Sequence, residues 1–470
     1  MKRFGIILGI VLATMLLVFL FSTSRVKRSS YFQEDYYQKT VGRIDSIKSV
    51  TVSDDDSIMA GFARVSITPG LNNPEDNFLE GKFIKVPLAG FGARKGKAAT
   101  GVHDSIFIKA VALKVNRRII ILVGADLLIM PPNIIDTVTA VLAKSGISRG
   151  QVFYSATHTH SSLGGWGPGF IGSQFAGNEN KNLVKWLVLQ ISQAVTSAVE
   201  DLRPARIGSG IFNAAPYTRN RLIGESGTKN DDFGFITVAQ TGHRKAVIGS
   251  FSAHSTTMGS GNMEISADYP GYWERKMEKT SFDLALFCGG SVGSQSPSGE
   301  GKGWDKPKFI GEALADSLNG QLPGVVLNEK VPFSAVSLKM HLPDYHIRLT
   351  TRINLSTCLS KKLMPLPGNV YLQALRIGNM VWITTPCDFS GEYALQIKNS
   401  LAAKGFNANV SGFNGSYVGY IIPGRYFYLD EYESKLMGWF GPDMGEYTVD
   451  LIRRISEIVI KPVPILKTSL

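Results

Sequence analysis

Three consecutive stretches decide the fold class: "IFIKAVALKVNRRIIILVGADLL" (residues 106–128), "PNIIDTVTAVLAKSG" (132–146) and "QVFYSA" (151–156). The first predicts two strands, because two apolar runs flank an Asn-Arg-Arg turn. The second predicts a helix with Pro132 near its start and Gly146 past its end. The third is a short apolar run that is typical of a buried strand. Strand, helix and strand in this order indicate an α/β fold.

Further elements extend this pattern along the chain. Apolar residues at helical spacing predict a helix in "NKNLVKWLVLQISQAVTSAVEDL" (180–202). Turn signals within apolar runs predict two hairpins and one more strand, in "FGFITVAQTGHRKAVIGSFSAH" (233–254), "YLQALRIGNMVWITTPCDF" (371–389) and "LALFC" (284–288). We therefore expect a mixed β-sheet domain with flanking helices, and we place this catalytic domain at residues 58–470.

The N-terminal region does not continue the α/β pattern of the rest of the chain. "FGIILGIVLATMLLVFLF" (4–21) contains no charged residue, and a helix of this length spans about 27 Å, enough for a bilayer core. We expect residues 1–28 to form a transmembrane anchor, with a cleaved signal peptide as the alternative. Residues 29–57 are polar and predict a tether. The expected location is therefore membrane-anchored, with an extracytoplasmic catalytic domain, although basic residues on both flanks leave the orientation open.

Composition narrows the function classes. The 470-residue chain is 44% hydrophobic, which suffices for a large core without disulfides. The formal charge is +12, but no basic stripe is interleaved with aromatic residues, so nucleic acid is not an expected partner. The three cysteines, Cys288, Cys358 and Cys387, lack CxxC spacing. This excludes a cysteine-based zinc or redox motif.

Polar residues follow directly on the predicted strands. His158 and His160 follow "QVFYSA", His254 ends "VIGSFSAH", Ser296 comes after "LALFC", and Asp388 follows "MVWITTP". Ligands bind in the crevice at the carboxyl ends of strands in open α/β sheets, so these side chains are expected to meet there. If the chain stays extended from residue 157 to 160, both histidines share one face.

Two imidazoles and a carboxylate form a hydrolytic zinc shell with an open position, which lowers the pKa of a bound water. The alternative for Asp388 is an N-cap, since a helical pattern follows it. The glycine- and serine-rich loop "CGGSVGSQSPSGEGKG" (288–303) could offer donors to an oxyanion, or be a surface loop. Arg221 could likewise contact an oxyanion, or it could form an ion pair with a surface carboxylate. The tyrosines near residue 420 fit packing as well as catalysis.

Seven motifs resemble those of the neutral ceramidase family in order and approximate spacing. They are "AGFARVSITP" (60–69), "THTHSS" (157–162), "NR" (220–221), "AHSTTMG" (253–259), "GSQSPS" (293–298), "TPCDF" (385–389) and "YVGY" with "EYES" (417–420 and 431–434). The resemblance spans residues 60–442. It implies a zinc-dependent amidohydrolase that splits ceramide into sphingosine and a fatty acid.

The resemblance also implies roles for single residues. It makes His158, His254, Asp388 and Tyr420 ligands of one zinc ion. It makes Ser296 the active-site serine, and it places His160, Arg221 and Tyr432 against the substrate or the transition state. Whether Ser296 attacks or only orients the substrate stays open at this point.

Three departures from the family pattern stand out. Ser294 and Ser298 replace an Asp and an Asn of the serine loop. Asp388 replaces a Glu that is longer by about 1.5 Å, so either the backbone lies closer or Glu392 serves instead. We also expect no immunoglobulin-like C-terminal domain. The resulting expectation is hydrolysis of a lipid amide, with a zinc hydrolase of another amide or ester, or a silent membrane-tethered binding protein, as alternatives.

Overall fold

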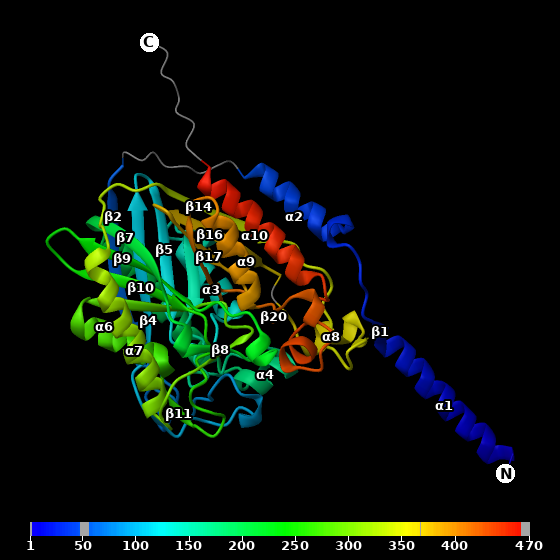
Figure 1. Ribbon diagram of the computed structural model, residues 1–470. Coiled ribbons are helices and arrows are strands. Elements are labelled where there is room, and N and C mark those ends of the chain that lie inside the picture. Colours follow the sequence, from blue (N-terminus) through cyan, green and yellow to red (C-terminus); the bar gives the residue numbers. More distant parts are fainter. Residues whose placement is uncertain (1, 48–55, 367, 462–470) are drawn as a thin grey trace.

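The computed structural model describes residues 2–47, 56–366 and 368–461, which fold into two stacked β-sheets between two layers of helices (Figure 1). In this part of the chain the larger sheet has eight strands in the order β12-β10-β9-β7-β2-β4-β5-β6. Their bounds are β12 Leu284–Gly289, β10 Lys245–Phe251, β9 Asp232–Gln240, β7 Arg203–Asn213, β2 Ile58–Ser66, β4 Phe107–Val115, β5 Arg118–Ala125 and β6 Val152–Ala156. The β10–β12 and β5–β6 pairs are parallel and the other pairs are antiparallel, so the sheet is mixed, as predicted.

The second sheet has the order β14-β16-β17-β19, with bounds Phe333–Met340, Val370–Ile377, Met380–Thr384 and Asn407–Ser411. Alternation along β5 shows how the sheets stack: Ile121 and Val123 face helices, whereas Ile120 and Leu122 face the second sheet. On the second sheet, Trp382 packs into the same inter-sheet core.

Each sheet carries helices on its outer face. The larger sheet is covered by α3 (Pro132–Ala143), α5 (Lys181–Glu200), α6 (Asp268–Thr280) and α7 (Asp305–Gln321). The smaller sheet is covered by α2 (Asp35–Ser46), α9 (Gly391–Ala402) and α10 (Met444–Ile460). The predicted strand–helix–strand unit is therefore β5, α3 and β6, and Pro132 begins α3 as expected.

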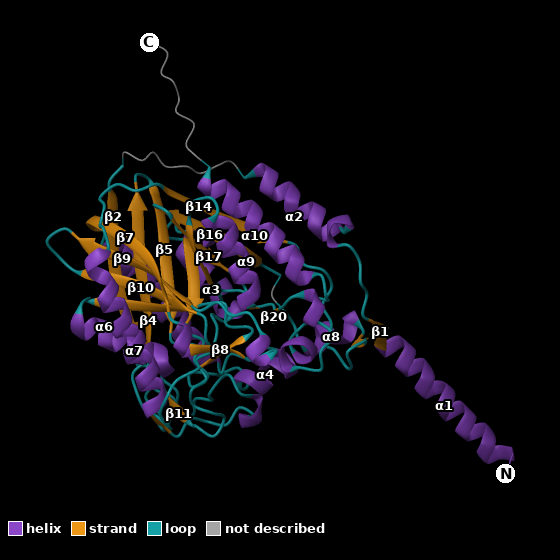
Figure 2. Cartoon of the chain, in the orientation of Figure 1, coloured by secondary structure: helices purple, strands orange, loops and turns teal. Residues whose placement is uncertain are grey.

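Short elements gather at one end of the sheets, around β8, β11 and α4 (Figure 2). Four small strand pairs lie among them: β1 (Thr23–Arg25) with β15 (Ile353–Leu355), β3 (Gly101–Val102) with β11 (Glu264–Ile265), β8 (Thr218–Asn220) with β13 (Gln295–Pro297), and β18 (Asp388–Phe389) with β20 (Tyr420–Ile421). The short helices are α4 (Gly169–Ala176), α8 (Thr357–Leu363) and the π-helical η8 (Tyr432–Leu436). The remaining single turns are η1 Tyr31–Gln33, η2 Gly92–Arg94, η3 Arg149–Gln151, η4 Ala215–Tyr217, η5 Gly224–Ser226, η6 Leu322–Gly324 and η7 Gly424–Tyr426.

The N-terminal predictions need correction. The apolar run lies in α1 (Lys2–Ser22), which extends from the body beside α8 (Figure 1). Within the described residues, no helix reaches the combined length and hydropathy of a membrane span, so the predicted transmembrane anchor is not supported.

The predicted polar tether is folded over much of its length. Helix α2 buries Tyr37, Thr40 and Ile44 against the smaller sheet and α10. The Tyr37 hydroxyl donates a hydrogen bond to Asp450 of α10 at 3.0 Å. The sequence analysis missed this helix because its burial depends on contacts with distant α10. Residues 48–55 of the expected tether and residues 462–470 of the expected catalytic domain lie outside the described residues.

Candidate metal centre

The ends of several strands bring the predicted polar residues together. His158 follows β6, His254 follows β10, and Asp388 lies in β18, just after β17. Asp388 pairs with Tyr420 across the parallel β18–β20 ladder. These four residues are buried. The expectation that these strand ends meet is therefore confirmed for the histidines and Asp388. Asp388 is not an N-cap, because Ser390 occupies that position of α9.

The His-Thr-His segment turns instead of running extended. His158 has a φ of +59°, a left-handed conformation that costs free energy for a residue other than glycine. The turn lets Thr159 pair with Ser255 and lets the His160 backbone N–H donate to the Ser255 carbonyl at 3.1 Å. The two imidazoles still converge, with 3.3 Å between their Nε2 atoms.

The backbone fixes which ring nitrogen of each histidine faces the centre. His158 Nδ1 donates to the Leu128 carbonyl at 2.7 Å, and His254 Nδ1 donates to the Val292 carbonyl at 2.8 Å. Carbonyl oxygens only accept, so Nδ1 carries the hydrogen in both rings. The Nε2 lone pairs then point inward, which is the arrangement that metal-binding histidines require.

These lone pairs meet a carboxylate. Asp388 Oδ1 lies 3.2 Å from His158 Nε2 and 3.3 Å from His254 Nε2, and it receives no hydrogen bond from the described residues. Burial lowers the pKa of His254 to about 3, so this ring is neutral at pH 7. Burial alone raises the pKa of Asp388, but the facing imidazoles lower it below its ordinary value. Acceptor atoms that face one another in this way call for a cation between them.

The distances fit a small divalent ion. Metal–ligand bonds of about 2.0–2.1 Å in a tetrahedron place ligand atoms about 3.3 Å apart. The two histidine–aspartate distances match this value, and the Tyr420 hydroxyl lies 2.9 Å from His254 Nε2. A set of His158, His160 and His254 could also hold a metal, since their ligand nitrogens all lie within 4.8 Å of one another. The cluster is therefore a candidate metal centre.

Of the two candidate carboxylates, Asp388 lies at the cluster and Glu392 does not. Glu392 lies in the first turn of α9 and accepts hydrogen bonds from Arg425 at 2.6 Å through both of its oxygens. Asp388 reaches the centre instead, because its β18 backbone pairs directly with that of Tyr420. The shorter side chain is thus compensated by a closer backbone.

Arg221 and Tyr432 border the cluster. The Arg221 guanidinium donates to the Tyr420 hydroxyl at 3.0 Å, and its Nε lies 2.7 Å from Glu433 Oε1. The Tyr432 ring meets the Tyr420 ring edge-on, with centroids 5.7 Å apart. Burial and the nearby Asp388 raise the pKa of Tyr432, so its phenol keeps its proton at neutral pH.

Ser296 follows Gln295, whose carbonyl lies 3.0 Å from His254 Nδ1. It is half-buried in β13, where its backbone partner is Arg219 of β8, and it is not among the residues that line the cavity described below. Its neighbour Gln295 is fully buried and holds the serine loop: its amide donates to Thr218 Oγ1 and the Asn230 carbonyl, both at 2.9 Å. The Gln295 carbonyl in turn accepts from the His254 backbone N–H at 3.2 Å.

Two important residues escaped the sequence analysis. Tyr417 donates to Asp388 Oδ2 at 2.7 Å and so orients the carboxylate. Gln295 anchors the loop described above. Tyr417 stood in the quoted motif "YVGY", but only the contact with Asp388 reveals its role; Gln295 had no signal beyond its place between two serines.

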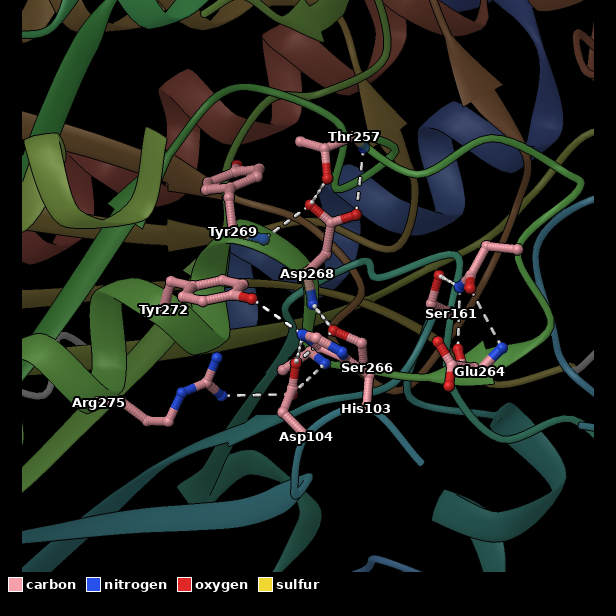
Figure 3. A network of polar contacts seen from close by, with 12 residues as sticks. His103, Asp104, Ser161, Thr257, Glu264, Ser266, Asp268, Tyr269, Tyr272 and Arg275 are labelled. Atoms are coloured by element: carbon pink, nitrogen blue, oxygen red, sulfur yellow. Dashed lines mark hydrogen bonds and ion pairs between the residues drawn. The ribbon is translucent and has the colours of Figure 1, made fainter. Parts of the chain in front are cut away.

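A separate polar network supports the loop that carries His254 (Figure 3). Asp268 begins α6 at a φ of +56° and is fully buried. Its carboxylate accepts from Thr257 Oγ1 at 2.7 Å and from the Tyr269 N–H at 2.7 Å. The Tyr269 hydroxyl donates to the carbonyl of Ala253, the residue before His254, at 2.7 Å. Asp268 therefore connects α6 to the loop that presents His254.

This buried carboxylate predicts a pH-dependent stability. Burial raises the pKa of Asp268 to about 6, whereas an unfolded Asp titrates near pH 3.9. The folded state therefore holds its proton longer, and the free energy of unfolding falls as pH rises from about 4 to above 6. We expect wild type to lose roughly 2–3 kcal/mol relative to Asp268→Asn over this range. Urea unfolding at several pH values measures the difference.

Exposed Asp305, in the first turn of α7, gives a matched control. The Asp305→Asn substitution should not produce this trend. Parallel pH curves for wild type and Asp268→Asn would contradict the prediction.

A cavity of about 290 Å³ opens beside the cluster. His158, His160, Tyr420 and Tyr432 lie in its wall. Most of the remaining wall is apolar or aromatic: Leu128, Ile129, Pro132, Trp166, Pro168, Ile171, Phe175, Met364, Pro365, Leu366, Tyr417, Met437 and Trp439. The candidate metal centre therefore faces an apolar ligand cavity.

Comparison with known proteins identifies solved structures with a similar fold. No family model matches the sequence. A crystal structure of neutral ceramidase from Pseudomonas aeruginosa is similar with a TM-score of 0.73 at 20% sequence identity, over 87% of this chain and 76% of that one. A ceramidase complexed with C2 is similar with a TM-score of 0.73 at 19% identity, over the same shares. The chain therefore has the neutral ceramidase fold.

Proposed function

We propose that the protein is a zinc-dependent amidohydrolase that cleaves the N-acyl bond of ceramide or a similar lipid amide. The observation that carries this proposal is the convergence of His158 Nε2, His254 Nε2 and Asp388 Oδ1 beside an apolar cavity whose wall includes His158. Nitrogen and oxygen ligands at these separations suit zinc. The similar fold of the ceramidases supports the substrate class.

A zinc ion held by His158, His254, Asp388 and Tyr420 would supply a Lewis acid for the amide carbonyl and would acidify a water molecule. The side chains around it supply the rest. The Arg221 guanidinium, held by Glu433, offers positive charge to a developing oxyanion beside Tyr420. The cavity wall excludes water from the acyl group.

Two wall residues are suited to proton transfer. Burial, together with the imidazoles of His158 and His254, lowers the pKa of His160 well below its ordinary value. His160 is then neutral at pH 7 and can accept a proton from the attacking water. The protonated phenol of Tyr432 can donate one to the leaving amine.

The direct test uses fluorescent short-chain ceramides and the full chain. We expect release of fatty acid, loss of activity with a chelator, and recovery when zinc is restored. Ser296→Ala separates two mechanisms, and a modest reduction in turnover would favour attack by a water molecule. A near-total loss, with an acyl-enzyme trapped in wild type, would assign nucleophilic attack to the serine instead.

A folded, zinc-loaded protein that is inert on ceramides, other N-acyl amides and simple esters would overturn the hydrolase proposal. It would favour a binding protein of the same fold. Activity confined to simple esters or small amides would retain the zinc hydrolase and reject the lipid substrate.

A further inference from the structure

Three segments that contribute to the cavity wall repeat one arrangement. In each, a residue in the cavity wall adjoins a large apolar residue that faces solvent. Ile171 adjoins Phe170 in α4, Met364 adjoins Leu363 at the end of α8, and Met437 adjoins Leu436 at the end of η8. The exposed fractions are 63% for Phe170, 36% for Leu363 and 56% for Leu436. We call these three exposed residues the apolar rim.

Contacts between the segments hold the rim together. A Cβ atom at Gly169 of α4 would lie 2.6 Å from Pro365, so α4 packs against the chain that leaves α8. Buried Arg348 donates to the Phe427 carbonyl at 2.8 Å and to the Ser434 carbonyl of η8 at 2.7 Å. Figure 1 shows α4 and α8 near one another at the same end of the molecule. The rim is thus a surface of the folded body.

The surroundings of the rim are cationic beside α8, whereas exposed Asp430 and Glu431 precede η8. Residues 345–387, which include α8, contain no Asp or Glu. Strand β1 pairs with β15 just before α8 and brings a second basic segment to the same edge. The exposed basic residues of these two segments are Arg25, Lys27, Arg28, Arg352, Lys361 and Lys362. Lys361 is partly offset by Asp344 at 2.9 Å.

Exposed apolar side chains surrounded by basic ones are typical of surfaces that bind anionic lipid bilayers. We propose that the apolar rim docks on an anionic bilayer, so that a lipid amide passes from the bilayer into the cavity. The role of the docked lipid as substrate rests on the proposed function, whereas docking itself does not. Bilayer attraction by the six basic residues should weaken with salt, because counterions screen it.

The native cysteines allow a local test on the full chain. Cys358 lies in α8 and is exposed, whereas Cys288 and Cys387 are buried. An environment-sensitive fluorophore on Cys358 therefore reports the surroundings of the rim. We expect a blue shift with phosphatidylglycerol vesicles, a weaker one with phosphatidylcholine vesicles, and reversal of the first at high salt.

Matched variants distinguish an effect of the apolar rim from an effect of exposed apolar residues elsewhere on the surface. Phe170→Ser combined with Leu436→Ser should raise the phosphatidylglycerol concentration for half-maximal shift by about tenfold or more, since two apolar anchors are lost. Leu79→Ser combined with Val326→Ser removes residues of 74% and 73% exposure from segments that do not contribute to the cavity wall. This control pair should leave the titration unchanged.

The outcomes are distinct. Equal shifts for the rim and control variants, or no shift with vesicles, would overturn the docking proposal. A blue shift that grows with protein concentration in the absence of vesicles would assign the rim to self-association instead. Turnover of a soluble short-chain amide should be the same in the rim variant and wild type. Vesicle docking without any turnover would reject the proposed function and leave docking intact.

Discussion

Replacing His254 by alanine is expected to weaken zinc binding by more than about 100-fold, because loss of even an outer-shell partner costs 10–100-fold. His254 is fully buried and its Nδ1 is committed to backbone carbonyls, so only Nε2 is left for a metal. Competition with a chromophoric chelator measures the affinity. His254→Ala should therefore purify with little zinc.

His243 provides the control for this prediction. It is an exposed histidine in the turn between β9 and β10, remote in sequence from the cluster residues. The His243→Ala variant should bind zinc as wild type does. Undiminished zinc in a folded His254→Ala protein would show that the metal, if bound, lies elsewhere.

Replacing Arg221 by alanine is expected to lower kcat by about 100-fold or more while zinc stays bound. The guanidinium contacts the Tyr420 hydroxyl and is oriented by Glu433. In the proposed mechanism it stabilises the negative charge that develops on the substrate. Such groups act on the transition state more than on the bound substrate, so KM should change less than kcat. Steady-state kinetics on a short-chain ceramide, paired with zinc analysis, measure both effects.

Two further variants serve as controls for the Arg221→Ala prediction. Arg219 lies two residues earlier in β8 and is exposed, so Arg219→Ala should retain full turnover. Arg221→Lys keeps the charge but loses the planar donor pair, and it should recover part of the loss. If kcat for Arg221→Ala matched that of Arg219→Ala, the guanidinium would have no role in the transition state.

The elements with strong periodicity could be predicted from sequence. The β4–β5 hairpin, the α3 start at Pro132 and strand β6 appear as expected, because their apolar runs and turn residues act locally. The stacking of a second sheet was not predictable, since the continuous apolar run of β17 indicates two buried faces without showing what covers each. Helix α2 was missed because its burial depends on distant α10.

The candidate site, like the fold, could be predicted from the sequence only in part. That His158, His254 and Asp388 would meet could be inferred from their places after strands. The left-handed turn at His158 could not, because it depends on the pairing of Thr159 with Ser255 across almost one hundred residues. The choice of Asp388 over Glu392 likewise required the β18–β20 ladder.

The metal centre is the central claim, and anomalous diffraction at the zinc edge tests it most directly. Crystals of protein purified with zinc should show one strong peak per chain, about 2.0–2.2 Å from His158 Nε2, His254 Nε2 and Asp388 Oδ1. A zinc-edge map with no peak among these three atoms, or with its peak at another site, would contradict the account.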